Sequence, residues 1–239
     1  MTASVTVSVS GTGSTSNGTP VVLAVANGAS FQHAYAPGML LSVFGTELAP
    51  TNAAASSVPL PISMEGVAVT VNGVAAPLYY VSTNQLNIQI PYGTAVNTPA
   101  TLRINNNGLL TSFPFTSAAA APGIFTDQNN GIVPSRSAAH GGNVTLFLTG
   151  AGVVNPEIAS GAAPVLGTLV TSLPKPIQSV IVKVGGVQAP VEFIGIPWSL
   201  VGVTQINFQV PSSLAAGAQP VVVSVGGVPS APASLTITN

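Results

Sequence analysis

The heptapeptide Gln85-Leu86-Asn87-Ile88-Gln89-Ile90-Pro91 recurs almost unchanged as Gln205-Ile206-Asn207-Phe208-Gln209-Val210-Pro211. Each copy alternates amide side chains with apolar ones and stops at proline, which is typical of a half-buried strand that ends at a turn. We expect the apolar residues to pack inward and the amides to face outward or an interface. The duplication predicts two related units.

The spacing of turn signals around the repeated heptapeptide predicts the fold. Asn72-Gly73 follows an alternating stretch and is the strongest short signal for a hairpin. Turn residues recur about every 8 to 12 positions, as in a β-sandwich, and no segment has a convincing helical period. The sequence therefore predicts an all-β chain of two tandem immunoglobulin-like β-sandwich domains with an extra N-terminal β-strand. The expected divisions are 1–20, 21–121 and 122–239.

The N-terminal segment alternates Val5, Val7 and Val9 with hydroxyl residues, which predicts a strand. Residues 11–20 are a Gly/Ser/Thr-rich linker that would let this strand lie away from the first domain. The strand could pair with its own domain or be the remnant of a preceding one. Alternatively, it could add to an open sheet edge of a neighbouring molecule.

The composition is poor in charge. Charged residues make up 4% of the 239 residues and the formal net charge is -1, so no electrostatic footprint for nucleic acid or an anionic membrane is present. Low net charge favours association, and few carboxylates can link folding to pH. The chain has no cysteine, no run of 18 apolar residues and no recognisable signal peptide. We expect no cofactor and no membrane insertion.

Several short motifs are similar to the uncharacterised C-terminal domain family of secreted acidobacterial proteins, itself related in style to immunoglobulin-like IPT/TIG modules. The resemblance covers nearly the whole chain after the N-terminal strand. It implies secretion and an adhesive or structural role, and it supplies no catalytic residues. The matching residues are Asn27-Gly28-Ala29-Ser30-Phe31, Ala36-Pro37-Gly38, Phe44-Gly45, Val69-Thr70-Val71-Asn72-Gly73, Ala76-Pro77-Leu78, Gln85-Leu86-Asn87, Gln89, Pro91-Tyr92 and Ala121-Pro122-Gly123-Ile124-Phe125.

The two histidines are candidates for catalysis or a shared metal. His33 and His140 precede the glycine turns of the two copies, and Asp127 with Ser135 or Ser137 and His140 could be drawn as a triad. No nucleophile-elbow pattern accompanies these serines. We therefore favour turn or surface roles for the histidines and expect no enzyme.

The stretch Asp127-Gln128-Asn129-Asn130-Gly131 resembles a fragment of a calcium loop. One carboxylate is little charge for Ca²⁺, which takes six to eight oxygen ligands. An Asx turn accounts for the same residues, and we favour it.

Aromatic residues are candidates for sugar stacking or for an interface, namely Tyr79, Tyr80, Tyr92 and Trp198. Strand alternation is expected to turn one of Tyr79 and Tyr80 outward, and Trp198 lies in an insertion before the second heptapeptide. No acid or amide cluster can be placed beside them from sequence. Packing in the core or at a domain interface is therefore the favoured role of Trp198.

These features together predict a secreted structural or adhesive protein, extracellular or on the cell surface, whose signal peptide is not present in this chain. We expect its main partner to be itself, in a filament or surface layer, with Val5, Val7 and Val9 as the assembly strand. The alternative is a carbohydrate- or protein-binding appendage of a larger secreted protein, with surface glycans as partners. Tyr79, Tyr80 and Trp198 are then the candidate contact residues.

Overall fold

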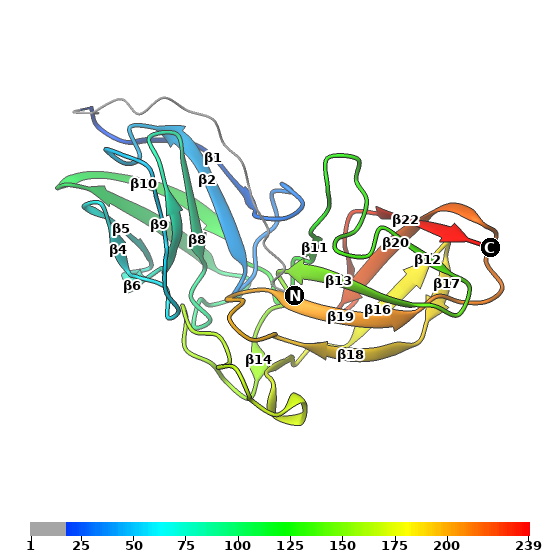
Figure 1. Ribbon diagram of the computed structural model, residues 1–239. Coiled ribbons are helices and arrows are strands. Elements are labelled where there is room, and N and C mark those ends of the chain that lie inside the picture. Colours follow the sequence, from blue (N-terminus) through cyan, green and yellow to red (C-terminus); the bar gives the residue numbers. More distant parts are fainter. Residues whose placement is uncertain (1–17) are drawn as a thin grey trace.

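The computed structural model describes residues 18–239, which form two β-sandwiches in tandem (Figure 1). The predicted all-β class, with two immunoglobulin-like sandwiches, is confirmed. The helical structure of the described residues is a single 3₁₀ turn, η1 (Val170–Ser172). Between residues 18 and 239, no helix has the length and apolar character needed to span a bilayer.

The first sandwich has one sheet in the order β1-β2-β8-β7-β3 and another in the order β10-β9-β5-β4, with β6 paired to β5. The predicted hairpin at Asn72-Gly73 is confirmed, since both residues have positive φ, 50° and 83°, and β5 pairs with β6 across them. The strands are β1 (Val21–Asn27), β2 (Leu40–Thr46), β3 (Ala53–Ala54), β4 (Ser63–Met64), β5 (Val67–Val71), β6 (Val74–Ala75), β7 (Leu78–Val81), β8 (Gln85–Gln89), β9 (Pro99–Asn106) and β10 (Leu109–Thr116).

The second sandwich repeats this plan with one sheet in the order β11-β13-β19-β18 and another in the order β12-β22-β20-β16-β17. β21 pairs with β20, and β14 and β15 form a separate ribbon. The strands are β11 (Gly123–Ile124), β12 (Ser137–Ala139), β13 (Asn143–Thr149), β14 (Val154–Asn155), β15 (Lys175–Pro176), β16 (Val180–Val184), β17 (Val187–Ala189), β18 (Val191–Gly195), β19 (Thr204–Gln209), β20 (Gly217–Val225), β21 (Val228–Pro229) and β22 (Ala233–Thr238).

The repeated heptapeptides form β8 and β19, which occupy equivalent places in the two sandwiches. β8 lies between β2 and β7, and β19 lies between β13 and β18. All six alternating apolar residues of these strands and their ends are buried, so the predicted inward row is confirmed in both copies. They are Leu86, Ile88, Ile90, Ile206, Phe208 and Val210.

Each sandwich has its own hydrophobic core, and the two cores meet at the Ala-rich connection. Ala120 packs in the second core, and Ala121 packs in the first. Successive residues of an extended chain point to opposite sides, which lets one short segment serve both cores. The division expected between residues 121 and 122 stays a prediction.

The two sandwiches are joined by hydrogen bonds from the last amide of the first heptapeptide. The Gln89 side chain is fully buried; its Nε2 donates to Gly38 O at 3.1 Å and its Oε1 accepts from Gly161 N at 2.6 Å. Gly161 belongs to a loop of the second sandwich, drawn in yellow-green beneath the joint in Figure 1. The Gly161 carbonyl in turn accepts from Leu60 N at 2.7 Å. One amide therefore satisfies backbone groups from both sandwiches.

The equivalent amide of the second copy has no such role. Gln209 Nε2 donates to Gly141 O at 3.0 Å, which repeats the bond between Gln89 and Gly38, yet its side chain is exposed. Within residues 18–239, no backbone N–H donates to Gln209 Oε1. The two glutamines are thus a matched pair that differ in burial and in one hydrogen bond.

We predict that Gln89→Ala lowers the free energy of unfolding by about 1–3 kcal/mol, because it leaves the buried Gly161 N–H and Gly38 C=O without partners. Gln209→Ala should change it by less than about 0.5 kcal/mol, because water replaces the lost partner at an exposed site. Urea unfolding of the three proteins measures both values. Equal losses in the two variants would contradict this role for Gln89.

Candidate functional site

The insertion before β19 runs along the joint and is anchored on the first sandwich. Tyr79 OH donates to Val201 O at 2.8 Å. Thr149 Oγ1 donates to Gly202 O at 2.7 Å and accepts from Leu40 N at 2.9 Å. The insertion predicted at residues 195–201 is therefore held at both sandwiches, and it is a fixed part of the joint.

Trp198 projects from this insertion and is fixed by a second loop. Its Nε1 donates to Thr168 O at 3.1 Å, and Ser199 N donates to Pro164 O at 3.2 Å. The indole is 40% exposed. The bond to Thr168 uses the only donor of the ring, so the exposed part offers a flat apolar surface.

A groove of about 410 Å³ lies beside this indole. Its lining combines apolar side chains of the loops with side chains of β18 and β19. Gly195 helps to shape it, because a Cβ at that position would lie 3.0 Å from the Phe193 ring. The lining residues are Val170, Leu173, Glu192, Phe193, Pro197, Trp198, Gln205 and Asn207.

The two amides in the groove are oriented by hydrogen bonds. Asn207 Oδ1 accepts from Gln205 Nε2 at 2.9 Å and from Thr145 Oγ1 at 3.1 Å. In these bonds, the Asn207 oxygen and the Gln205 nitrogen face each other. Within the described part of the chain, Asn207 Nδ2 and Gln205 Oε1 have no hydrogen-bond partner. A donor group and an acceptor are therefore left for a ligand.

The first copy contains the same amide pair. Gln85 Nε2 donates to Asn87 Oδ1 at 2.8 Å, and Ser42 Oγ donates to the same oxygen at 3.2 Å. There, however, Gln85 is buried, whereas Gln205 is half-buried. The internal bonds of the pair are thus conserved between copies, and only its accessibility differs.

A β-bulge changes the expected positions of the two tyrosines. The register of β7 shifts between Leu78 and Tyr80, so strict alternation fails and both Tyr79 and Tyr80 are half-buried. Tyr80 pairs with Asn87 across the two strands, and the expectation that one of the two rings faces outward stays a prediction. The same shift occurs in β18 between Val191 and Phe193, which makes Glu192 the counterpart of Tyr79.

The edge of β10 is an open feature of the first sandwich. β10 pairs with β9 on one side, and the structure gives it no ladder on the other side between residues 18 and 239. In the second sandwich, the matching strand β22 is covered by β12, which runs parallel to it from Ser137 to Ala139. Among the described residues, the first copy has one bond of this kind, from Ala118 N to Tyr35 O, just beyond the end of β10.

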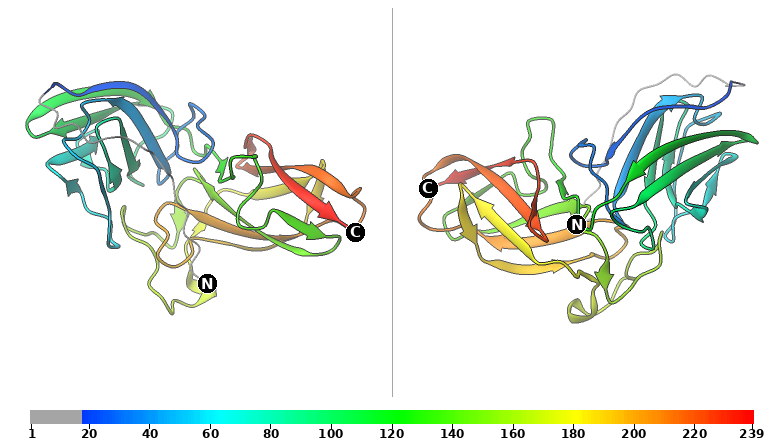
Figure 2. Two further views of the ribbon diagram at one scale, coloured as in Figure 1. Left: turned by 45° about the horizontal axis from the view of Figure 1, so that its top comes forward. Right: turned by 180° about the vertical axis from the view of Figure 1, so that it is seen from behind.

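The core is progressively uncovered along this edge. Residues 109, 111, 113 and 115 of β10 point inward, and exposure increases from 7% at Phe115 to 39% at Leu109. Phe113 packs on the core only partly, as does Val22 of β1, the strand that lies beside β10. Seen from behind in Figure 2, β10 forms the long green edge of its sheet. An incoming strand could cover these side chains.

The residues expected to supply such a strand, Val5, Val7 and Val9, lie outside the residues that the structure describes. Their assembly role stays a prediction. The same holds for the extra N-terminal β-strand to which they belong.

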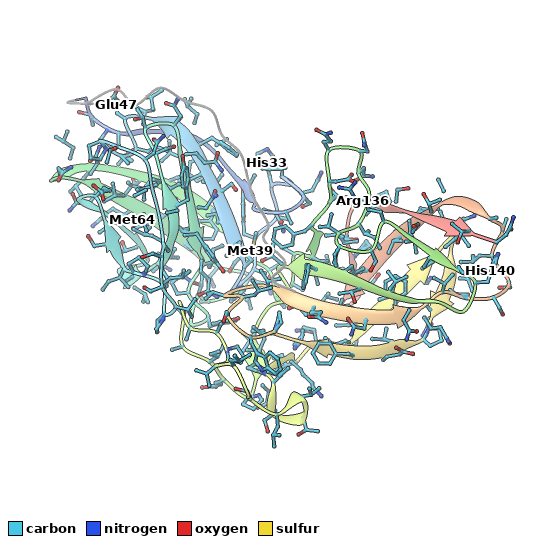
Figure 3. All side chains as sticks on the ribbon, in the orientation of Figure 1. His33, Met39, Glu47, Met64, Arg136 and His140 are labelled. Atoms are coloured by element: carbon cyan, nitrogen blue, oxygen red, sulfur yellow. The ribbon has the colours of Figure 1, made fainter. Side chains whose placement is uncertain are left out.

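The residues considered for catalysis and metal binding are dispersed. Figure 3 shows His33 on the first sandwich and His140 at the far end of the second. Asp127 pairs with Arg136 Nε at 3.0 Å rather than with His140, and Ser135 Oγ accepts from Thr145 N. Among the described residues, no three His, Asp or Glu side chains gather as a metal site would require.

Asp127 forms the Asx turn that the sequence favoured. Its Oδ1 accepts from Asn129 N and Gly131 N, both at 2.9 Å. The bonds from the Gly131 and Asn129 N–H groups and the nearby Arg136 charge hold the pKa of this carboxyl below its ordinary value. Both carboxylate oxygens therefore already have partners within the protein.

The sequence failed to place an acid or amide cluster beside an aromatic side chain, and the structure corrects this. Glu192, Gln205 and Asn207 line the groove next to Trp198. The amides of the second heptapeptide were visible in the sequence. The sequence did not predict that the insertion folds back over their face of the sheet.

We predict that stability falls as the pH rises from about 10 to 12. Burial raises the pKa of Tyr79 to about 12 from its ordinary 10.0, and burial raises the pKa of Tyr92 as well, with nearby Tyr79 adding to the shift. The unfolded chain therefore loses protons in this range that the folded chain keeps, and this lowers stability.

Thermal unfolding between pH 7 and 12 tests this expectation. Tyr79→Phe should weaken the alkaline decrease while costing about 1 kcal/mol at pH 7 for the lost hydrogen bond. Adding Tyr92→Phe to Tyr79→Phe should reduce the remaining alkaline loss of stability still more. An alkaline decrease of unchanged slope in the double variant would contradict the assignment.

Comparison with known proteins places no family name on the chain: no family model and no curated protein matches it. Among solved structures, the chain is similar to the plexin A4 full extracellular region at 11% identity and a TM-score of 0.34, over 92% of this chain and 18% of that chain. It is similar to Bacteroides ovatus SGBP-B, from a mixed-linkage glucan utilization locus and in complex with a heptasaccharide, at 12% identity and a TM-score of 0.28, over 93% of this chain and 48% of that one. It is similar to domains 5–6 of the S-layer protein SbsC at 15% identity and a TM-score of 0.27, over 92% of this chain and 99% of that one. The chain thus spans less than half of the plexin and SGBP-B chains, and likenesses at these scores carry no argument about function. The resemblance to acidobacterial secreted proteins stays a prediction.

Proposed function

We propose that the protein is an extracellular structural or adhesive protein without catalytic activity, whose copies assemble into a filament or surface layer. Assembly occurs by strand donation. The N-terminal segment, residues 2–10, of one copy adds to the open edge of β10 in the next.

The uncovered edge of β10 is the observation that carries this proposal. The hairpin closes at Asn106 and Leu109, so residues 109, 111, 113 and 115 direct their backbone groups to β9. The backbone groups of the even-numbered residues face the open side. Within residues 18–239, the N–H groups of Leu110 and Ser112 have no partner, so an added strand can pair with them and cover the partly exposed row of inward-facing side chains.

The proline at position 114 restricts where the added strand pairs. Pro114 lacks an N–H group and faces the open side, which is where edge strands tolerate proline. The useful ladder is thus the half of β10 from residue 109 to 113. This is also the half whose inward side chains are partly exposed, and the alternating Val5, Val7 and Val9 have the spacing to cover them.

The low charge of the surface supports association. Lys and Arg number four and Asp and Glu number five in the whole chain, so copies approach one another with little repulsion. No Lys or Glu lies in residues 2–10, or in β10, to prevent pairing between strands.

We predict that deletion of residues 2–10 abolishes polymers and leaves folded monomers. Electron micrographs and sedimentation velocity report assembly, and thermal unfolding reports whether the sandwiches stay intact. Because the deleted segment is the donor, a truncated chain that still assembles as before rules out strand donation.

A complementary variant tests the acceptor. Ser112→Pro removes a free edge N–H that takes no part in the ladder with β9, so the fold should tolerate it. The full-length variant should not polymerise alone, but it should form one-to-one complexes with the truncated chain, whose acceptor edge is intact. Ser112→Ala keeps the N–H and should polymerise like the wild type. If the mixture stays monomeric, β10 is not the acceptor.

A further inference from the structure

We propose that the groove beside Trp198 binds a neutral pyranose chain. This site is on the second sandwich and does not depend on strand donation to β10. Its volume, about 410 Å³, lies within the range of small-molecule sites, roughly 300–1,000 Å³.

The aromatic side chains supply a stacking surface. The indole of Trp198 is fixed by its bond to Thr168 O, so its exposed face is held ready for a ligand at little entropic cost. An aromatic face carries negative electrostatic potential, and it attracts the weakly positive C–H groups on one face of a pyranose ring. Phe193 extends the apolar surface towards the sheet.

The polar side chains supply both kinds of hydrogen-bonding group. Asn207 Nδ2 is the donor left free by the amide pair, and Gln205 Oε1 and the Glu192 carboxylate are acceptors. Sugar hydroxyls each donate and accept, so neighbouring hydroxyls can engage such a mixed set. The fixed orientation of the pair means that its bonds need not rearrange when a ligand enters.

The charge in the groove selects against anionic ligands. Glu192 is the only charged residue in the lining, and no Lys, Arg or His lines the groove. Phosphates, sulfates and uronic acids would therefore meet a carboxylate without a compensating cation. Neutral sugars carry no such penalty.

The counterpart face of the first sandwich indicates why a protein partner is disfavoured. There, Tyr79 occupies the position of Glu192, and its hydroxyl bonds the second sandwich. Tyrosine is enriched in dry protein interfaces, and glutamate is depleted in them. The exchange of Tyr for Glu at this position replaces an interface residue with one that stays hydrated.

Titration calorimetry of the full chain with cellohexaose, mannohexaose and chitohexaose tests the proposal. At least one hexasaccharide should bind, and heparin should not. Trp198→Ala should weaken that binding about tenfold or more, because an aromatic contact of this kind carries energy beyond its buried area. Trp198→Phe keeps a smaller ring and should restore part of the affinity.

Two further variants make the result specific to the groove. Asn207→Ala removes the free donor and should also weaken binding, whereas Phe31→Ala removes an exposed aromatic ring on the first sandwich and should leave affinity unchanged. Unfolding curves identify any variant that fails to fold.

Three outcomes would overturn the proposal. One is that the wild type binds none of the hexasaccharides. Another is that it binds with an affinity that Trp198→Ala does not change. The third is a sedimentation shift in which Trp198→Ala alone converts associated chains to monomers, since this would assign the groove to a second copy of the chain.

Discussion

The buried side chain of Gln89 is the interaction on which the arrangement of the molecule depends. Its amide satisfies a carbonyl of the first sandwich and an N–H of the second, in a place that water does not reach. A buried backbone group without a partner costs more free energy than a hydrogen bond contributes, so a side chain that cannot make both bonds would destabilise this site. The Gly161 loop is consequently held beside the first sandwich. A separate bond from Tyr79 to Val201 holds the insertion, whose Pro197 and Trp198 line the groove.

The two copies show how one strand pattern can serve two purposes. The amide pair is built identically in both, with a hydroxyl from the neighbouring strand as third member, Ser42 in one and Thr145 in the other. Gln85 of the first copy is buried, whereas Gln205 of the second is half-buried and lines the groove beside Trp198. Because the internal bonds keep each amide in place, accessibility could diverge without loss of the fold.

Uncharged polar groups make most of the side-chain interactions that hold this protein together. One ion pair, between Arg136 and Asp127, is present among the described residues, and the joint is held by amide, hydroxyl and backbone groups. Such bonds are little affected by salt. This property suits an extracellular protein that must stay folded and associate under changing conditions, which agrees with the function proposed.

Local sequence determined the strands, the Asn-Gly hairpin and the inward rows of β8 and β19, because alternation and turn chemistry act over a few residues. It also determined that the chain is a tandem. Only the tertiary structure decided which copy of the amides is covered, that bulges displace Tyr79 and Glu192 from strict alternation, and that Trp198 lies beside Gln205 and Asn207. These features depend on contacts between residues far apart in the chain, such as Gln89 with Gly161 and Tyr79 with Val201. A local pattern contains no information on which distant loop will cover a given face. Here the equivalent face is part of the joint in the first sandwich and an open groove in the second.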